Sequence, residues 1–227
     1  MRRSLVVPGV YERQRPLHKP TMTDPFQIIT PEALAGLFGP VAPAAMQKDS
    51  HTLTPQYREM VAASPFALIG TTGPNGLDIS PRGDSPGFVH VANERTLLLP
   101  ERPGNNRIES LRNLLHDSRL ALIFLIPGVG ETLRIRGRGM ITTDPELLQR
   151  FAVGAALPRC VIRIAVDCVF FQCARAIRRS RLWDPALPAT LPPVPSAGSM
   201  LKPLLPEGFD ASAYDQGLLD RQQNSLY

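Results

Sequence analysis

Short apolar runs separated by turn residues fill the chain from residue 66 onward. Apolar positions that alternate or run together over about four to eight residues are typical of β-strands, and glycine, proline and asparagine between them are typical of hairpin turns. Gly73-Pro74-Asn75-Gly76 is such a turn. The pattern predicts strands at residues 66–71, 77–80, 88–91, 96–100, 119–126, 132–142 and 160–171.

Two threonine-proline pairs mark helix starts ahead of the first strand. Thr30-Pro31 and Thr54-Pro55 each provide an N-cap and a proline at the first helical position. We expect helices from there to about Phe38 and to just before Ser64-Pro65. Further helices are expected at 108–115, where apolar residues recur at helical spacing, at 144–152, and as a turn or two within 174–183.

The order of these elements favours one class of fold. Four strands, a helix, two strands, a helix and a last strand follow one another, mostly through hairpin connections. We therefore expect a mainly β protein with flanking helices (α+β), in which an antiparallel sheet closes into a barrel. Residues 1–24 are expected to be a flexible basic tail, with Met22 as an alternative translation start. Residues 25–183 would form the barrel domain with its N-terminal helices, and 184–227 a proline-rich arm with a short helix capped by Asp210.

The net charge of +5 argues less for nucleic-acid binding than it first suggests. Residues 1–20 hold five basic side chains and one acidic side chain, so the rest of the chain is nearly neutral. The three cysteines form no CxxC pair, which predicts a reducing, cytoplasmic setting without a disulfide framework or a metal site. No apolar run approaches the length of a membrane span. Residues 83–87 match G-x-S-x-G, but a proline and then a strand follow Ser85, so we do not predict a serine hydrolase.

Arginines gather where the loop at 102–107 opens into a helix. The positive end of a helix dipole lies at its N-terminus, so cations are unusual there. Arg102 approaches this helix start, and Arg107 lies at it. A bound anion, held by free backbone N–H groups and guanidinium groups, would account for them. The loop Pro103-Gly104-Asn105-Asn106 is therefore a candidate phosphate site, with a solvent-exposed turn as the alternative.

Three other features allow both a functional and a purely structural interpretation. Arg82, in Ser80-Pro81-Arg82, would supply a second cation to the anion or pair with Asp84 or Asp78 at the surface. Arg134, Arg136 and Arg138 alternate along one strand, which is typical of a solvated sheet face but also suits a cofactor, acidic groups of a partner subunit or RNA, although the interleaved aromatic residues expected of an RNA-binding sheet are missing. Trp183 would either stack on a planar ligand or anchor a core or interface.

Four strings, in this order, resemble the pyridoxamine 5'-phosphate oxidase-like flavoproteins, and more narrowly the FMN-dependent split-barrel proteins. They are DISPRGDSPGFV, TLLLPERPGNNRIESLRN, LIFLIPGVGETLRIRGR and FFQCARAIRRSRLW. The resemblance runs from about Phe66 to Trp183. It implies an antiparallel split β-barrel and a homodimer with FMN at the subunit interface.

The resemblance also implies roles for particular residues. Arg82, Asn106, Arg107 and Ser110 stand where such proteins hold the FMN phosphate, with Arg112 one turn further along. Thr132 and Arg134 stand on the strand that contacts the flavin from the partner subunit, and Trp183 stands where a C-terminal element approaches the active site.

One departure from the family pattern concerns the substrate. Where true pyridoxamine phosphate oxidases carry an Arg-Leu-His-type signature, this chain has Arg181-Leu182-Trp183-Asp184. The sequence thus predicts an FMN-dependent oxidoreductase of unnamed substrate that is not a true pyridoxamine phosphate oxidase. No acid or base presents itself as catalytic, as suits chemistry carried by a cofactor. The alternative is a non-catalytic module that holds a flavin or a haem on the same barrel.

Overall fold

The computed structural model describes Asp24 and residues 26–227, which separate into two compact units. One unit ends at Gln47, and the other runs from Lys48 to Tyr227. The first unit contains α1 (Pro31–Ala35) and α2 (Pro43–Met46). Thr30 caps α1 as expected, with its Oγ1 accepting a hydrogen bond from the backbone of Ala33. The predicted basic tail lies outside the described residues except for Asp24.

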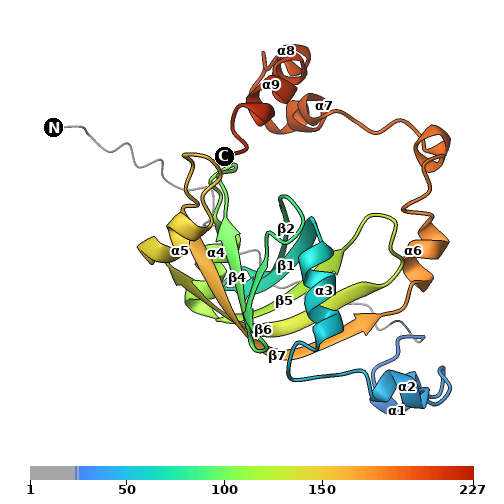
Figure 1. The fold of residues 1–227 in the computed structure, drawn as a ribbon. Helices are drawn as coiled ribbons and strands as arrows, with labels where there is room; N and C mark the ends of the chain where they lie inside the picture. The colour runs from blue at the N-terminus through green and yellow to red at the C-terminus, as the bar shows by residue number, and fades with distance from the viewer. Residues whose placement is uncertain (1–23, 25) are drawn as a thin grey trace. The chain divides into compact units, whose positions relative to one another are not determined.

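Seven antiparallel strands form the sheet of the second unit, in the order β2-β1-β5-β6-β7-β4-β3 (Figure 1). Every pairing between neighbours is antiparallel, as the hairpin connections predict. The strands are β1 (Phe66–Gly73), β2 (Gly76–Gly83), β3 (His90–Asn93), β4 (Thr96–Glu101), β5 (Arg119–Leu125), β6 (Thr132–Thr142) and β7 (Cys160–Gln172).

The two ends of this sheet must approach one another, because β2 and β3 are consecutive in the chain. In a flat sheet, strands about 4.8 Å apart would place β2 and β3 roughly 29 Å apart. The step from Gly83 to His90 reaches about 25 Å at most when fully extended. It also contains a turn, in which the Phe88 N–H donates to the Ser85 carbonyl over 3.1 Å. The sheet therefore curls, which is the antiparallel split barrel with flanking helices that the sequence predicts.

That turn also explains a difference from the sequence prediction. We expected a strand over 88–91, but β3 begins at His90. Ser85-Pro86-Gly87 bends the chain, and Gly87 has a positive φ of 83°. The N–H of Gly87 donates to the Ser64 carbonyl, which places this bend beside the end of α3 (Pro55–Ala63).

The other helices follow the sequence closely. They are α4 (Glu109–His116) before β5, α5 (Pro145–Arg150) before β7, and α6 (Arg175–Ser180) after it. Thr54 and Asp144 cap α3 and α5 through their side chains, as predicted. No helix among the described residues is long and apolar enough to cross a membrane.

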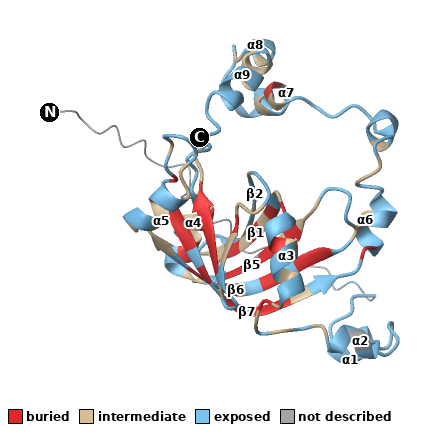
Figure 2. Cartoon of the chain, in the orientation of Figure 1, coloured by how far each residue is buried: buried red, intermediate tan, exposed pale blue. Residues whose placement is uncertain are grey.

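The core lies on the inner face of the sheet, where buried residues alternate along β1, β5, β6 and most of β7 (Figure 2). Along β6, Leu133 and Ile135 are fully buried while Arg134, Arg136 and Arg138 are exposed. Gly137 comes next on the buried side, at an irregularity in the β6–β7 pairing. A Cβ on Gly137 would lie only 2.3 Å from the carbonyl oxygen of Ala165, so a side chain does not fit there.

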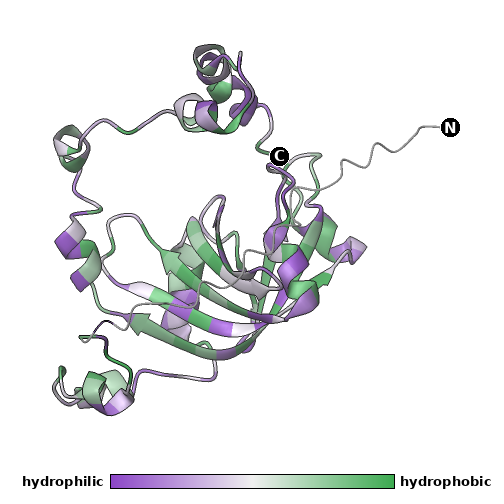
Figure 3. Ribbon diagram, turned by 180° about the vertical axis from the view of Figure 1, so that it is seen from behind, coloured by the Kyte–Doolittle hydropathy of each residue, from purple (hydrophilic) through white to green (hydrophobic). Residues whose placement is uncertain are grey.

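The outer face of the sheet is partly apolar (Figure 3). On β2, the side chains of Leu77 and Ile79 are 89% and 71% exposed, and Phe66 on β1 is 37% exposed. Large apolar side chains exposed together mark a surface that binds something. On the same face, beyond β5, β6 carries the three alternating arginines.

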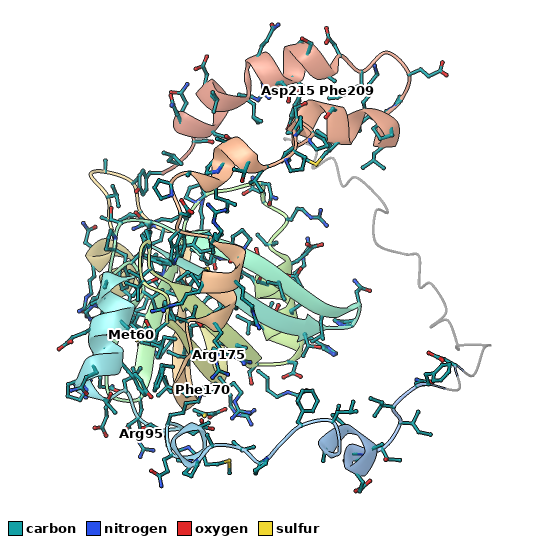
Figure 4. All side chains as sticks on the ribbon, turned by 90° about the vertical axis from the view of Figure 1, so that its right-hand side faces the viewer. Met60, Arg95, Phe170, Arg175, Phe209 and Asp215 are labelled. Carbon is teal, nitrogen blue, oxygen red and sulfur yellow. The ribbon has the colours of Figure 1, made fainter. Side chains whose placement is uncertain are left out.

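The C-terminal segment contains more helix than its proline content predicts. It forms η1 (Leu187–Thr190), α7 (Ala197–Leu201), η2 (Lys202–Leu204), α8 (Ala211–Gln216) and α9 (Leu218–Gln223). Asp210 caps α8 as expected. Asp215, labelled in Figure 4, accepts a hydrogen bond of 2.7 Å from the Gly198 N–H and so links α8 to α7. A Cβ on Gly198 would clash with the Ala211 carbonyl at 2.3 Å, so this close approach requires glycine.

Candidate functional site

A cavity of about 600 Å³ lies where β2, the loop after β4 and the start of α4 meet. Its wall includes Arg82, Asn106, Arg107 and Ser110, so the structure brings together four of the predicted phosphate-site residues. Arg102 also lines it. The corner predicted from the sequence is therefore a hollow in the protein and not an isolated surface turn.

The backbone at this corner is strained where the helix begins. Ile108, the N-cap residue of α4, has a φ of 51°, and Asn106 has a φ of 58°. Asparagine adopts this left-handed conformation at little cost, but a β-branched residue does so rarely. No side chain caps α4, so its first N–H groups are not satisfied in the usual way. Backbone strain of this kind gathers at ligand sites.

Arg82 is held by a buried ion pair that spans two distant strands. Its Nε donates to Oε1 of Glu101 on β4 over 2.8 Å, and its Nη1 donates to Ser80 over 2.7 Å. The side chains of Arg82 and Glu101 are only 17% and 11% exposed. The surface pairing with Asp84 or Asp78 is thus wrong, because the curl of the sheet brings Glu101 at the end of β4 against Arg82, while Asp84 pairs with Arg102.

Arg102 forms a second, parallel ion pair. Its Nε donates to Oδ2 of Asp84 over 2.8 Å, and its Nη1 donates to the Phe151 carbonyl over 2.7 Å. The hydroxyl of Tyr227 donates to the other oxygen of Asp84. Burial acts to raise the pKa of Asp84, but these hydrogen bonds and that of the Ser85 N–H outweigh it, so the pKa lies below its usual range.

Helix α4 is set against the β1–β2 hairpin by two polar contacts. The hydroxyl of Ser110, which is 2% exposed, donates to Asp78 over 3.3 Å. The amide of Asn113 donates to Thr71 over 3.1 Å. A Cβ on Gly73 would lie 1.9 Å from the Asn113 side chain, so a larger residue there would displace that side chain and its hydrogen bond to Thr71. These contacts aim the first turn of α4 at the cavity.

Two further ionisable residues near the cavity are Arg107 and Cys160. Arg107 pairs with Glu109 over 2.9 Å, with its side chain 60% exposed. At the start of β7, burial and the negative charge of Glu101 raise the pKa of the Cys160 thiol, although Arg82 acts to lower it. Cys160 is therefore a neutral thiol and not a reactive thiolate.

The other predicted site residues lie elsewhere. Arg112 is exposed on α4 and does not line the cavity. Thr132 is buried at the start of β6. Arg134 lies over the Phe170 ring at 5.2 Å and donates to Gln172. Trp183 donates from its indole N–H to the Val129 carbonyl over 2.7 Å, which anchors it to the β5–β6 loop.

A second cavity, of about 730 Å³, lies on the outer face of the sheet. Arg136 and Arg138 line it together with Leu77 and Ile79, so part of the alternating arginine stripe faces a hollow and not a flat solvated sheet. Arg138 lies 3.7 Å from Asp167. Among the described residues, no group of three or more His, Cys, Asp or Glu side chains is placed to hold a metal ion.

One wall residue of the first cavity has no signal in the sequence. Arg159 follows Pro158, more than fifty residues after the other arginines of the cavity wall, yet it lines the same cavity. Only the pairing of β4 with β7, in which Glu101 faces Cys160, brings Arg159 there.

Comparison with known proteins agrees with this fold. The model of the pyridoxamine 5'-phosphate oxidase family matches residues 53–173, and the chain belongs to that family. No curated protein matches the chain.

Several solved structures are similar at low identity. HupZ of Group A Streptococcus is 20% identical with a TM-score of 0.44, covering 53% of this chain and 94% of its own. A putative pyridoxamine 5'-phosphate oxidase of Lactobacillus delbrueckii is 17% identical with a TM-score of 0.42, covering 53% and 95%. General stress protein 26 of Bacillus anthracis is 10% identical with a TM-score of 0.39, covering 50% and 88%.

Proposed function

We propose that the chain binds FMN with its phosphate in the cavity at the start of α4, and that it is an FMN-dependent oxidoreductase. The observation that carries this proposal is the helix start itself. Ile108 holds a left-handed conformation at an uncapped N-terminus that faces an arginine-lined hollow. Family membership supports the choice of FMN, since it makes a flavin the expected ligand.

The residues present fit a phosphate monoester. The N–H groups of the first turn of α4 and the positive end of its dipole favour an anion. Asn106 and Arg107 directly precede the first turn of α4 and line the cavity. Guanidinium groups bind phosphate through paired hydrogen bonds. A volume of about 600 Å³ falls within the range of cofactor pockets.

The chain's own residues would bind and orient the cofactor. When bound, FMN supplies hydride or electron transfer, a chemistry that amino-acid side chains lack. Ser110 and Asn113 fix the direction of α4, and the buried pairs of Arg82 and Arg102 hold the walls of the cavity. Anchoring the phosphate at one end restricts the positions that the flavin ring can take relative to a substrate.

A homodimer would complete the site. The exposed Leu77 and Ile79 form an apolar surface suited to burial against a second copy. Thr132, Arg134 and Trp183 lie apart from the phosphate cavity of their own subunit, so in this proposal the partner would supply them to the flavin. The arginines of β6 also need an anion or carboxylates opposite them once they are buried.

A flavin-binding module without turnover is the second candidate. The described residues of the phosphate-cavity wall, which include carboxylates but no histidine, cysteine or tyrosine, suit binding a ligand whether or not turnover follows. The same composition offers no usual axial ligand to a haem in that cavity.

The deciding experiment is the visible spectrum of freshly purified protein. We expect flavin bands and release of FMN, not riboflavin or FAD, on denaturation. Anaerobic addition of a reduced nicotinamide, followed by a candidate electron acceptor, separates the enzyme from the module. A colourless protein that takes up no added FMN would overturn the flavin proposal. FMN uptake without reduction or reoxidation by any acceptor would support the non-catalytic module and rule out the oxidoreductase.

A further inference from the structure

Three of the four arginines in the wall of the phosphate cavity are already neutralised by carboxylates. Arg82 pairs with Glu101, and Arg102 pairs with Asp84, both over 2.8 Å and both largely shielded from solvent. Arg107 pairs with Glu109 over 2.9 Å. Such pairs hold the wall in place, but each cation contributes less net attraction to an incoming anion than an unpaired one does.

Arg159 is the fourth arginine of this wall, and it differs from the others. Among the described residues, no carboxylate lies within ion-pair distance of its guanidinium group. The one wall carboxylate without an arginine is Asp78, which accepts a hydrogen bond from Ser110. Within the described part of the chain, the charge of Arg159 is therefore the cation in the cavity that no neighbouring carboxylate satisfies.

The backbone of Arg159 is fixed at the cavity edge. Its N–H donates to the Glu101 carbonyl over 3.0 Å, next to the point where β4 enters the phosphate loop. Pro158 before it and Cys160 after it are both buried. The side chain thus extends from an anchored position and not from a mobile loop tip, which lowers the entropic cost of using it to hold a ligand.

From this placement we propose that Arg159 is a ligand-binding residue that contacts the phosphate group of a phosphate monoester, opposite the first turn of α4. The inference rests on the proposed function, in which that monoester is FMN. It adds a contact from the segment before β7, so the phosphate would bridge that segment and helix α4. A dianionic phosphate, whose second pKa is about 6, would gain most from this extra cation.

The test compares FMN with riboflavin, which lacks the phosphate. Dissociation constants are measured by flavin fluorescence for the full-length wild type, R159A and R159K. We expect R159A to weaken FMN about tenfold or more and to leave riboflavin within about twofold. R159K should recover part of the loss, because it keeps the charge but not the paired hydrogen bonds. The matched control is R163A, an exposed arginine of β7 outside the cavity, which should change neither constant.

The outcomes separate this inference from the proposed function. Equal weakening of both ligands in R159A, or no weakening of FMN, would overturn the role of Arg159 while leaving the flavin proposal intact. If the wild type binds no flavin, the proposed function fails, and inorganic phosphate becomes the probe. A thermal stabilisation by phosphate that is lost in R159A but kept in R163A then supports a phosphate-binding Arg159, and equal stabilisation in both overturns it.

Discussion

The hydroxyl of Tyr227 donates a hydrogen bond of 2.7 Å to Oδ1 of Asp84, a residue 143 positions earlier in the chain. The guanidinium of Arg102 lies 5.5 Å from the centre of the same tyrosine ring and pairs with the other oxygen of Asp84. One carboxylate therefore joins the C-terminal segment to the wall of the phosphate cavity.

Replacing Tyr227 with phenylalanine should weaken this junction without removing the ring. The variant loses one hydrogen bond to Asp84, so the pKa of Asp84 should rise toward its usual range. A carboxyl group with a lowered pKa stabilises the fold above its unfolded pKa of about 3.9, and that contribution is lost as the pH falls through the folded value. We expect the free energy of unfolding to drop by about 1 kcal/mol at pH 7 and by less at pH 3.

Urea unfolding at both pH values, with NMR titration of the Asp84 carboxyl group, checks this prediction. Y214F is the control, because Tyr214 lies on α8 and makes no contact with Asp84 among the described interactions. An unchanged titration of Asp84 in Y227F would show that the hydrogen bond does not persist in solution.

Arg107→Ala should separate FMN from riboflavin. In the proposed complex, the guanidinium beside the first turn of α4 contacts the phosphate, a group that riboflavin lacks. Arg107 is already paired with Glu109 and exposed, so its loss should cost about 0.5–1.5 kcal/mol, and FMN should bind roughly two- to tenfold more weakly with riboflavin unaffected. Fluorescence titration measures both constants. R95A, in the exposed β3–β4 turn, is the control, and equal losses for both ligands in R107A would mark Arg107 as structural.

Ile108→Gly should stabilise the apoprotein or leave its stability unchanged. Glycine adopts a φ of 51° without the steric cost that isoleucine incurs, and Ile108 is 48% exposed, so little burial is lost. L115G is the matched control on the same helix, where an 80% exposed leucine in helical conformation is replaced. It should destabilise by about 1 kcal/mol. Thermal and urea unfolding compare the two, and a larger loss in I108G than in L115G would show that Ile108 is not strained.

Gly137→Ala should destabilise the barrel strongly. The new Cβ would meet the Ala165 carbonyl at 2.3 Å in the middle of the β6–β7 pairing, where backbone on both sides resists movement. We expect a loss of about 1–3 kcal/mol. G104A is the control, since nothing lies within 4 Å of a Cβ there, and its stability should stay within about 0.5 kcal/mol of wild type. Equal stability of the two variants would contradict the close approach at Gly137.

Ile79→Glu tests the proposed dimer. A charge in the middle of the apolar outer face should be costly once that face is buried against a second copy. We expect sedimentation to show a dimer for the wild type and a monomer for I79E. L115E introduces the same charge at an exposed leucine of α4 and should leave the dimer intact. A monomeric wild type, or a dimeric I79E, would place any interface elsewhere.

The sequence predicts the sheet well because its signals are local. Alternation and turn residues mark β6 at its exact bounds, Thr132–Thr142, and the threonine caps mark α3. Helix α7 is not predicted from the sequence, because apart from its Ser196 cap the contacts that hold it are not local. Gly198 approaches Ala211 closely and donates to Asp215, and neither contact leaves a pattern in the residues around it.

The candidate site was predictable only in part for a similar reason. Asn106 and Arg107 adjoin the helix they serve, so the sequence places them together. The partner of Arg82 is set by the curl of the sheet, and Arg159 reaches the cavity through strand pairing. Neither relationship is visible in spacing along the chain. The roles of Thr132, Arg134 and Trp183 at the flavin stay predictions that depend on a second subunit.

The short connection between β2 and β3 affects how the protein would aggregate after cleavage by a protease. Those strands are the two edges of the sheet, and the segment from Asp84 to Val89 is the direct covalent link across the closure. A protease cut there would remove that link, leaving contacts such as the pair of Arg82 on β2 with Glu101 on β4 to hold the two ends of the sheet together. The edges of β2 and β3, which do not pair with each other, would then be free to move apart and capture strands from other molecules, so nicking at this bend would favour aggregation.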